Sequence, residues 1–203
     1  MTLDIDDDLV CTITENVKYS HNASQSIKQY ASESKTEDEL LEAYEADKEG
    51  IFTEPLKVEN KTKTYPNYTV ATTYESENIL ESIGDKLFLD CTGGKGYKTN
   101  PFIEENRSYP VFFDNKIQET IVYSINVPDG YEILELPEKL NLSMPGSIAS
   151  FSFTPNQMNN KIVINSTLKV NKTFISGDMY GSLKTFFDNM IAKHKEKIVL
   201  QKL

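Results

Sequence analysis

Short runs in which apolar and polar residues alternate, separated by turn-forming residues, constrain the fold of this chain more than any other feature. After residue 100 these runs are YPVFF, ETIVYSINV, YEILELP, IASFSFTP and KIVINSTLKVNKTF. They are rich in Val, Ile, Thr, Tyr and Phe, which favour strands. Turn residues separate them, as in PDGY (128–131) and PGS (145–147). Short strands at this close spacing predict antiparallel, β-sandwich-like sheets.

Helical periodicity replaces this alternation near each end of the chain. Residues 22–49 predict two consecutive helices, the second opened by a capping box between Thr36 and Glu39. Residues 177–194 predict one amphipathic helix, followed by a last strand, KIVLQKL. Its apolar stripe consists of Met179, Leu183, Phe186, Phe187, Met190 and Ile191. The fold class that follows is α+β, mainly antiparallel β.

A glycine-rich stretch, TGGKGYKTNP (92–101), marks the best internal boundary. Residues 1–90 carry a net charge of −12 and residues 91–203 carry +2, which together give −10. We therefore predict a β-rich unit at 1–98, which carries the helices at 22–49. A β-sandwich-like unit at 99–203 would carry the helix at 177–194. A single continuous sandwich is the alternative.

The composition limits the classes of partner. Hydrophobic residues make up 38% of the chain and charged residues 26%, and no apolar run approaches the roughly 20 residues that a membrane crossing needs. The acidic balance disfavours nucleic acid, whose phosphates it would repel. The start, MTLDIDDD, lacks the basic region and apolar core of a signal peptide. Whether the chain is part of a longer protein, and its oligomeric state, are left open.

The acidic segment DIDDDLVCTITE has carboxylates at the spacing of a calcium-binding loop, namely Asp4, Asp6, Asp8 and Glu15. The pattern fails at Leu9, where such a loop needs a glycine for its sharp turn, and its flanks predict strands rather than helices. The sequence therefore favours an acidic hairpin turn without a metal. A weak calcium site at the three aspartates is left open.

Catalytic patterns are incomplete throughout the chain. The two cysteines, Cys11 and Cys91, lie in strand-like runs that predict buried thiols, and a disulfide between them is left open. Of the two histidines, His194 lies among lysines at a helix end, where we expect it to be exposed. GGKG (93–96) lacks the spacing of a phosphate-binding loop. We predict no catalytic residue, no metal and no cofactor.

Arg107 is the only arginine in the chain. It lies just before Tyr109 and Pro110, and the proline disfavours helix at the residue before it. The planar guanidinium can bridge carbonyl or carboxylate oxygens in a way that lysine cannot reproduce. We predict that Arg107 has a structural role, in which it pins the loop 92–108 to the sheet that begins at Val111. Ligand binding by Arg107 is the alternative.

Three motifs occur in a familiar order: NPF…ENRSYPVFF, then VPDGYEILELPEKL, then a striped helix ending in KEKIVLQKL. Their order resembles the C-terminal region of bacterial transglutaminase-like proteins, in which β-rich domains of unknown function flank a transglutaminase core. The resemblance covers residues 100–203. It implies that the catalytic triad lies outside this chain, so the chain is not an enzyme. It also implies an extracytoplasmic location, periplasmic or in the cell envelope.

Three functions are therefore weighed. The first is a non-catalytic accessory region of an exported transglutaminase-like protein, which packs on or positions the core in the same parent chain or its substrate. A large exposed apolar patch would favour it. The alternative is a stand-alone β-sandwich module that binds glycan or peptide, which a tyrosine-lined groove would favour. A hydrolase, the third, would need a buried pair of carboxylates.

Overall fold

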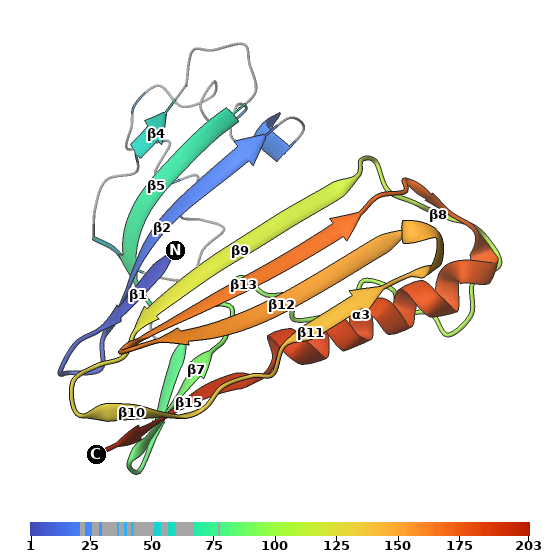
Figure 1. Ribbon diagram of the computed structural model, residues 1–203. Coiled ribbons are helices and arrows are strands. Elements are labelled where there is room, and N and C mark those ends of the chain that lie inside the picture. Colours follow the sequence, from blue (N-terminus) through green and yellow to red (C-terminus); the bar gives the residue numbers. More distant parts are fainter. Residues whose placement is uncertain are drawn as a thin grey trace. The chain divides into compact units, whose positions relative to one another are not determined.

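A computed structural model describes residues 1–20, 67–76 and 78–203, together with residues 23–25, 29, 36, 39, 42, 51–53 and 57–59 (Figure 1). The described chain forms two compact units, Met1–Asn78 and Ile79–Leu203. The sequence-based boundary, after residue 98, rested on the glycine-rich stretch. In the structure, strand β7 (Lys86–Asp90) precedes that stretch and pairs with the C-terminal strand β15 (Lys197–Lys202).

The first unit contains an antiparallel sheet in the order β1-β2-β5-β3, in which β4 also pairs with β5. Its strands are β1 (Thr2–Ile5), β2 (Cys11–Ser20), β3 (Ile51–Phe52), β4 (Lys57–Glu59) and β5 (Asn67–Glu75). Ile5 pairs with Cys11, so β1 and β2 form the predicted hairpin with the acidic turn between them. One face buries Leu3 and Ile13, as the alternation requires.

The helical pair predicted at 22–49 falls on a segment of which the structure describes only isolated residues. The pair therefore lies outside the described residues. Within the segment, the backbone N–H of Glu39 donates to the hydroxyl of Thr36 at 3.1 Å. This hydrogen bond, from the backbone of Glu39 to the side chain of Thr36, is one of the two that make up the capping box predicted from the sequence.

The second unit is built on a four-stranded antiparallel sheet, in the order β11-β12-β13-β9. Its strands are β9 (Ile117–Asn126), β11 (Leu140–Ser143), β12 (Ala149–Met158) and β13 (Lys161–Val170). Alternate residues of β12 and β13 are buried, which defines the inner face of the sheet. Ser166 is the one polar residue in the buried series on β13, which otherwise consists of Ile162, Ile164, Leu168 and Val170.

Helix α3 (Tyr180–His194) lies along this sheet, as Figure 1 shows. A short 3-10 turn (Gly177–Met179) precedes it. The His194 ring contacts the ring of Phe151 on β12 edge to face, at 5.2 Å between centroids, so the inner face of β12 packs against the helix. Of the predicted stripe, Leu183, Phe186, Phe187, Met190 and Ile191 are all buried. The predicted fold class, α+β and mainly antiparallel with a C-terminal helix, is confirmed.

A smaller antiparallel sheet has the order β10-β15-β7-β6. It consists of β6 (Leu80–Ile83), β7, β10 (Tyr131–Glu135) and β15, which is the final strand predicted from KIVLQKL. Central β15 buries three successive residues, Ile198, Val199 and Leu200. Its first pair joins Lys197 to Asp90, so the residues after Asp90 begin close to the end of α3.

The segment between β7 and β8 (Val111–Phe112) runs along helix α3 and ends in a two-stranded sheet. In that sheet Phe112 pairs with Phe174 of β14 (Phe174–Ile175). The backbone of this segment passes close to Gly177: a Cβ atom added there would lie 2.5 Å from the carbonyl oxygen of Ser108. Such a distance is shorter than side chains tolerate, so glycine is required by the close approach.

We expect Gly177→Ala to destabilise the protein by about 1–3 kcal/mol, because the added methyl group overpacks against the backbone of Ser108. Gly181→Ala is the matched control, since a Cβ atom there meets nothing within 4 Å and alanine favours helix. Thermal or urea unfolding of both variants measures the difference. Equal midpoints for the two variants would contradict the close approach.

Candidate functional site

His194 is buried in the last turn of α3, with only 5% of its surface exposed, so the predicted exposure was wrong. The sequence placed it correctly at a helix end, but the segment after β7 and the strands β12 and β13 cover that end. Its Nδ1 accepts the backbone N–H of Tyr97 at 3.1 Å, and its Nε2 lies 3.0 Å from the hydroxyl of Ser166. Ser166, the polar residue on the inner face of β13, is therefore paired with His194 of helix α3.

This Ser–His pair has the wrong proton arrangement for a nucleophilic dyad. Because Nδ1 accepts a backbone N–H, the neutral imidazole carries its proton on Nε2, and Nε2–H donates to the oxygen of Ser166. A general base would have to accept the serine proton at that nitrogen. Burial also lowers the pKa of His194 to about 4, while Asp90 acts in the opposite direction. The pair supports a role in packing the segment against the helix.

Cys91 lies at the same helix end but does not meet the imidazole. Its thiol is 3.6 Å from the carbonyl oxygens of Lys193 and His194, two of the carbonyls that a helix leaves free at its C-terminus. Burial raises the pKa of the Cys91 thiol to about 12, with Asp90 and Glu196 acting in the same direction. A nucleophilic cysteine needs the opposite shift. Cys11 is likewise buried, and both cysteines are free thiols.

The acidic turn of the first unit uses a carboxylate to hold the backbone. Asp6 Oδ1 accepts the backbone N–H groups of Asp8 at 3.0 Å and of Val10 at 2.8 Å. Glu15, the fourth residue of the calcium-like spacing, is buried and accepts a hydrogen bond from the Tyr74 hydroxyl. Within the described residues, no group of three His, Cys, Asp or Glu side chains is arranged to hold a metal ion.

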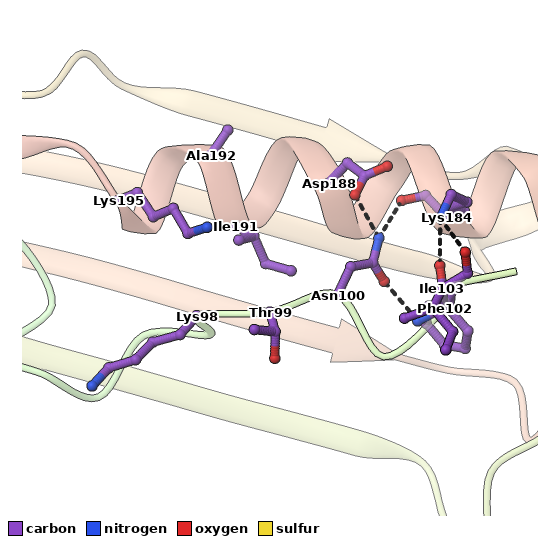
Figure 2. A pocket seen from close by; sticks show the side chains of 10 residues that line it. All are labelled: Lys98, Thr99, Asn100, Phe102, Ile103, Lys184, Asp188, Ile191, Ala192 and Lys195. Carbon is purple, nitrogen blue, oxygen red and sulfur yellow. Dashed lines mark hydrogen bonds between the residues drawn. The ribbon is translucent and has the colours of Figure 1, made fainter. Parts of the chain in front are cut away.

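A groove of about 550 Å³ runs between helix α3 and the segment at 98–103 (Figure 2). Its ten lining residues are Lys98, Thr99, Asn100, Phe102, Ile103, Lys184, Asp188, Ile191, Ala192 and Lys195. Three are lysines, one is an aspartate and none is a tyrosine. The groove is therefore apolar at its base and mainly cationic among its charged residues.

Two side chains hold the two walls of the groove together. Asn100 Nδ2 donates to the Lys184 carbonyl at 3.0 Å and to Asp188 Oδ1 at 2.7 Å, while Asn100 Oδ1 accepts the Phe102 N–H. The ammonium of Lys184 donates to the carbonyls of Phe102 and Ile103, at 2.7 and 3.2 Å. Figure 2 shows these bonds as a ladder at one end of the groove.

Arg107 lies exposed a few residues after this segment, within the loop 92–108. One of its guanidinium nitrogens donates to the Pro110 carbonyl at 3.4 Å, a long hydrogen bond. Its proposed pinning role stays a prediction. The segment has other anchors that the sequence did not single out: Asn100, Lys184, and Tyr180, whose hydroxyl donates to the Glu104 carbonyl at 3.0 Å. Asn100 and Lys184 are ordinary polar residues and Tyr180 is a buried aromatic residue, so no pattern in the sequence marks them as anchors.

An exposed aromatic surface, the aromatic edge, comprises Phe112 and Phe174, and Tyr109 precedes Phe112 by three residues in the chain. The rings of Phe112 and Phe174 pack edge to face at 5.2 Å between centroids, yet 71% and 54% of these residues remain exposed. Tyr109 is 79% exposed. The sequence contained a signal for this surface: Val111, Phe112 and Phe113 are consecutive, and a strand cannot turn all three to one face.

We expect acid to weaken the fold through His194. Its pKa falls from 6.5 to about 4 on folding, so the unfolded chain binds the extra proton between these values. The stabilising contribution is therefore complete above pH 6.5 and is lost as the pH falls toward 4, by roughly 2–3 kcal/mol. Urea unfolding from pH 7 to 4 measures it, with His194→Gln as the comparison. The same pH slope in both proteins would exclude His194 as the source.

Asn100→Ala should loosen the segment 98–103, because it leaves the Phe102 N–H and the Lys184 carbonyl without this partner. The expected cost is about 1–3 kcal/mol. Amide hydrogen exchange at Phe102 measures the loss, and Thr99→Ala, a neighbouring exposed residue, is the control. Arg107→Lys in the same assay tests the pinning prediction. Unchanged exchange and protease sensitivity over 92–108 would refute a pinning role.

None of the helices that the structure describes is long and apolar enough to cross a membrane. Comparison with curated proteins finds no match. Among solved structures, a candidate protease from Parabacteroides distasonis ATCC 8503 is similar, with a TM-score of 0.43 and 15% sequence identity. The match covers 49% of this chain and 19% of that chain, and it is too distant to carry an argument.

One family model matches residues 85–200, which run from just before β7 into β15. Its description is a domain of unknown function with solved structure, DUF3858. The matched range contains the helix, its sheet, the groove and the aromatic edge. On this match, which spans more than half of its length, the chain belongs to the DUF3858 family of domains of unknown function.

Proposed function

We propose that this chain is a non-catalytic accessory and interaction region of a larger, exported transglutaminase-like protein. It would pack on the catalytic core or position the core or its substrate. The observation that supports this function best is the aromatic edge, in which two phenylalanine rings contact each other and remain largely exposed. Aromatic side chains exposed together on a surface are typical of protein interfaces.

Covering this surface with a partner would be favourable, because it would remove apolar side chains from water. Burying one large apolar side chain contributes about 1.5–3 kcal/mol. Phe112 and Phe174 are cross-strand partners on a short two-stranded sheet, so they present a preformed surface. Little side-chain entropy would be lost when they are covered, since each ring already restricts the other.

The interior of the second unit supports a non-catalytic role. The thiol of Cys91 and the imidazole of His194 are both committed to contacts within the protein. A hydrolase that uses two carboxylates would need a buried acidic pair. Among the residues whose burial the structure describes, Glu15 is the only buried carboxylate.

The alternative function, a stand-alone module for glycan or peptide, has one observation in its favour, which is the groove of Figure 2. Its lining contains no tyrosine, so the ring stacking typical of sugar binding has no support there. The peptide form of the alternative is the better supported one.

Cell fractionation and an immunoblot with an antibody against this chain test the proposed context. An accessory region of an exported protein predicts a band much larger than 23.1 kDa in the envelope fraction. A soluble cytoplasmic band at 23.1 kDa would refute both the exported location and the parent transglutaminase-like chain.

Substitution then tests the aromatic edge in that parent protein. Phe112→Ser with Phe174→Ser should speed proteolysis between this region and the core, because the covered surface is lost. Leu134→Ser with Met158→Ser is the matched control, since both residues are also exposed and apolar. Equal cleavage rates for the two double variants would contradict packing through the aromatic edge.

A further inference from the structure

The geometry of the groove points to a second binding site, whose ligand is a short, extended peptide with acidic residues at one end and apolar residues at the other. This site shares no residue with the aromatic edge, so the inference does not rest on the accessory role; it specifies the ligand of the groove that supports the alternative function. It concerns the ten residues between α3 and the segment 98–103.

Charge favours an acidic ligand at one end. Lys98 and Lys195 are exposed at the end of the groove nearest the C-terminus of α3. Lys195 extends along the helix toward Ile191, whereas Lys98 extends away from the helix (Figure 2). The only carboxylate in the lining, Asp188, lies nearer the other end and accepts a hydrogen bond from Asn100. The net charge of −10 on the whole chain does not decide the matter, because salt screens charges beyond roughly 8 Å.

The opposite end has no excess of positive charge, since Lys184 and Asp188 both line it. There Ile103 is 78% exposed. The ammonium of Lys184, the only cation lining this end, already donates to two backbone carbonyls. An acidic residue is therefore favoured beside Lys98 and Lys195, and an apolar residue beside Ile103. The groove thus selects the direction of its ligand as well as its composition.

The length of the groove indicates the size of the ligand. Its helical wall runs from Lys184 to Lys195 through Asp188, Ile191 and Ala192, which lie on one face of the helix. At 1.5 Å per residue this wall is about 16 Å long. An extended peptide rises about 3.3 Å per residue, so about five residues span it.

The base of the groove supplies the apolar contact. Phe102 and Ile191 are mostly buried, but both form part of the groove surface, and the small side chain of Ala192, the next residue of the helix after Ile191, is exposed. The walls are held by Asn100 and Lys184, so the site is formed before a ligand arrives. Preformed sites lose less free energy to ordering when they bind.

The experiment is fluorescence anisotropy with a labelled pentapeptide that has two leucines at one end and two glutamates at the other, with both termini blocked. We expect saturable binding with a Kd below about 1 mM. Replacing the glutamates by glutamines, or the leucines by serines, should weaken binding at least about tenfold. Binding should also weaken with added salt.

Two variants locate the site on the protein. Lys98→Glu with Lys195→Glu should weaken binding at least about tenfold, and so should Ala192→Glu, which adds a carboxylate at an exposed helix position. Lys161→Glu with Lys172→Glu is the control, because it changes the net charge equally at exposed lysines outside the groove. Circular dichroism spectra of all three variants test whether they are folded.

Three results would overturn the inference. The first is the lack of saturable binding up to 1 mM peptide. The second is equal weakening by the control pair, which would show general attraction to lysines. The third is equal affinity for the glutamine peptide, which would remove the acidic end from recognition.

Discussion

The antiparallel pairing of β15 with β7 is the constraint on which the second unit depends. Only Lys195 and Glu196 separate the end of α3 from β15, and the first pair of the ladder joins Lys197 to Asp90. The chain that leaves β7 must therefore start at the last turn of the helix. From there it runs back along α3, and this return forms the second wall of the groove and leads to the two-stranded sheet of the aromatic edge (Figure 1).

Burying that junction is costly unless its polar groups are paired. The thiol of Cys91 contacts a carbonyl at the end of the helix, and Thr92 Oγ1 donates to Asp90 Oδ1 at 2.6 Å. The imidazole of His194 links the backbone of Tyr97 to Ser166. The side chains of Cys91 and His194 are thus used in packing this junction. The exposed residues of the same unit include lysines that line the groove and two phenylalanines, Phe112 and Phe174.

Much of the fold followed from local pattern. The alternation predicted the strands, and the apolar stripe predicted the helix from 177 to 194, because burial on one face imposes a period on the sequence. The histidine was misjudged because neighbouring lysines indicate exposure only when no other segment covers the helix end. Arg107 stood out by its rarity, whereas Asn100 and Lys184 hold the segment in the structure and have no distinguishing pattern.

The sequence by itself determined the C-terminal helix, most of the strands of the second unit and its mainly antiparallel class, since these depend on periodicity and turn residues close together in the chain. It did not predict the short strands β6 and β11. It also determined the charge asymmetry between the two parts. Only the tertiary structure decided that β7 belongs with β15, that His194 meets Ser166, and that Phe112 and Phe174 share one exposed surface. Each of these contacts joins residues far apart in the chain, and their pairing depends on which strands and helices pack together rather than on any local preference.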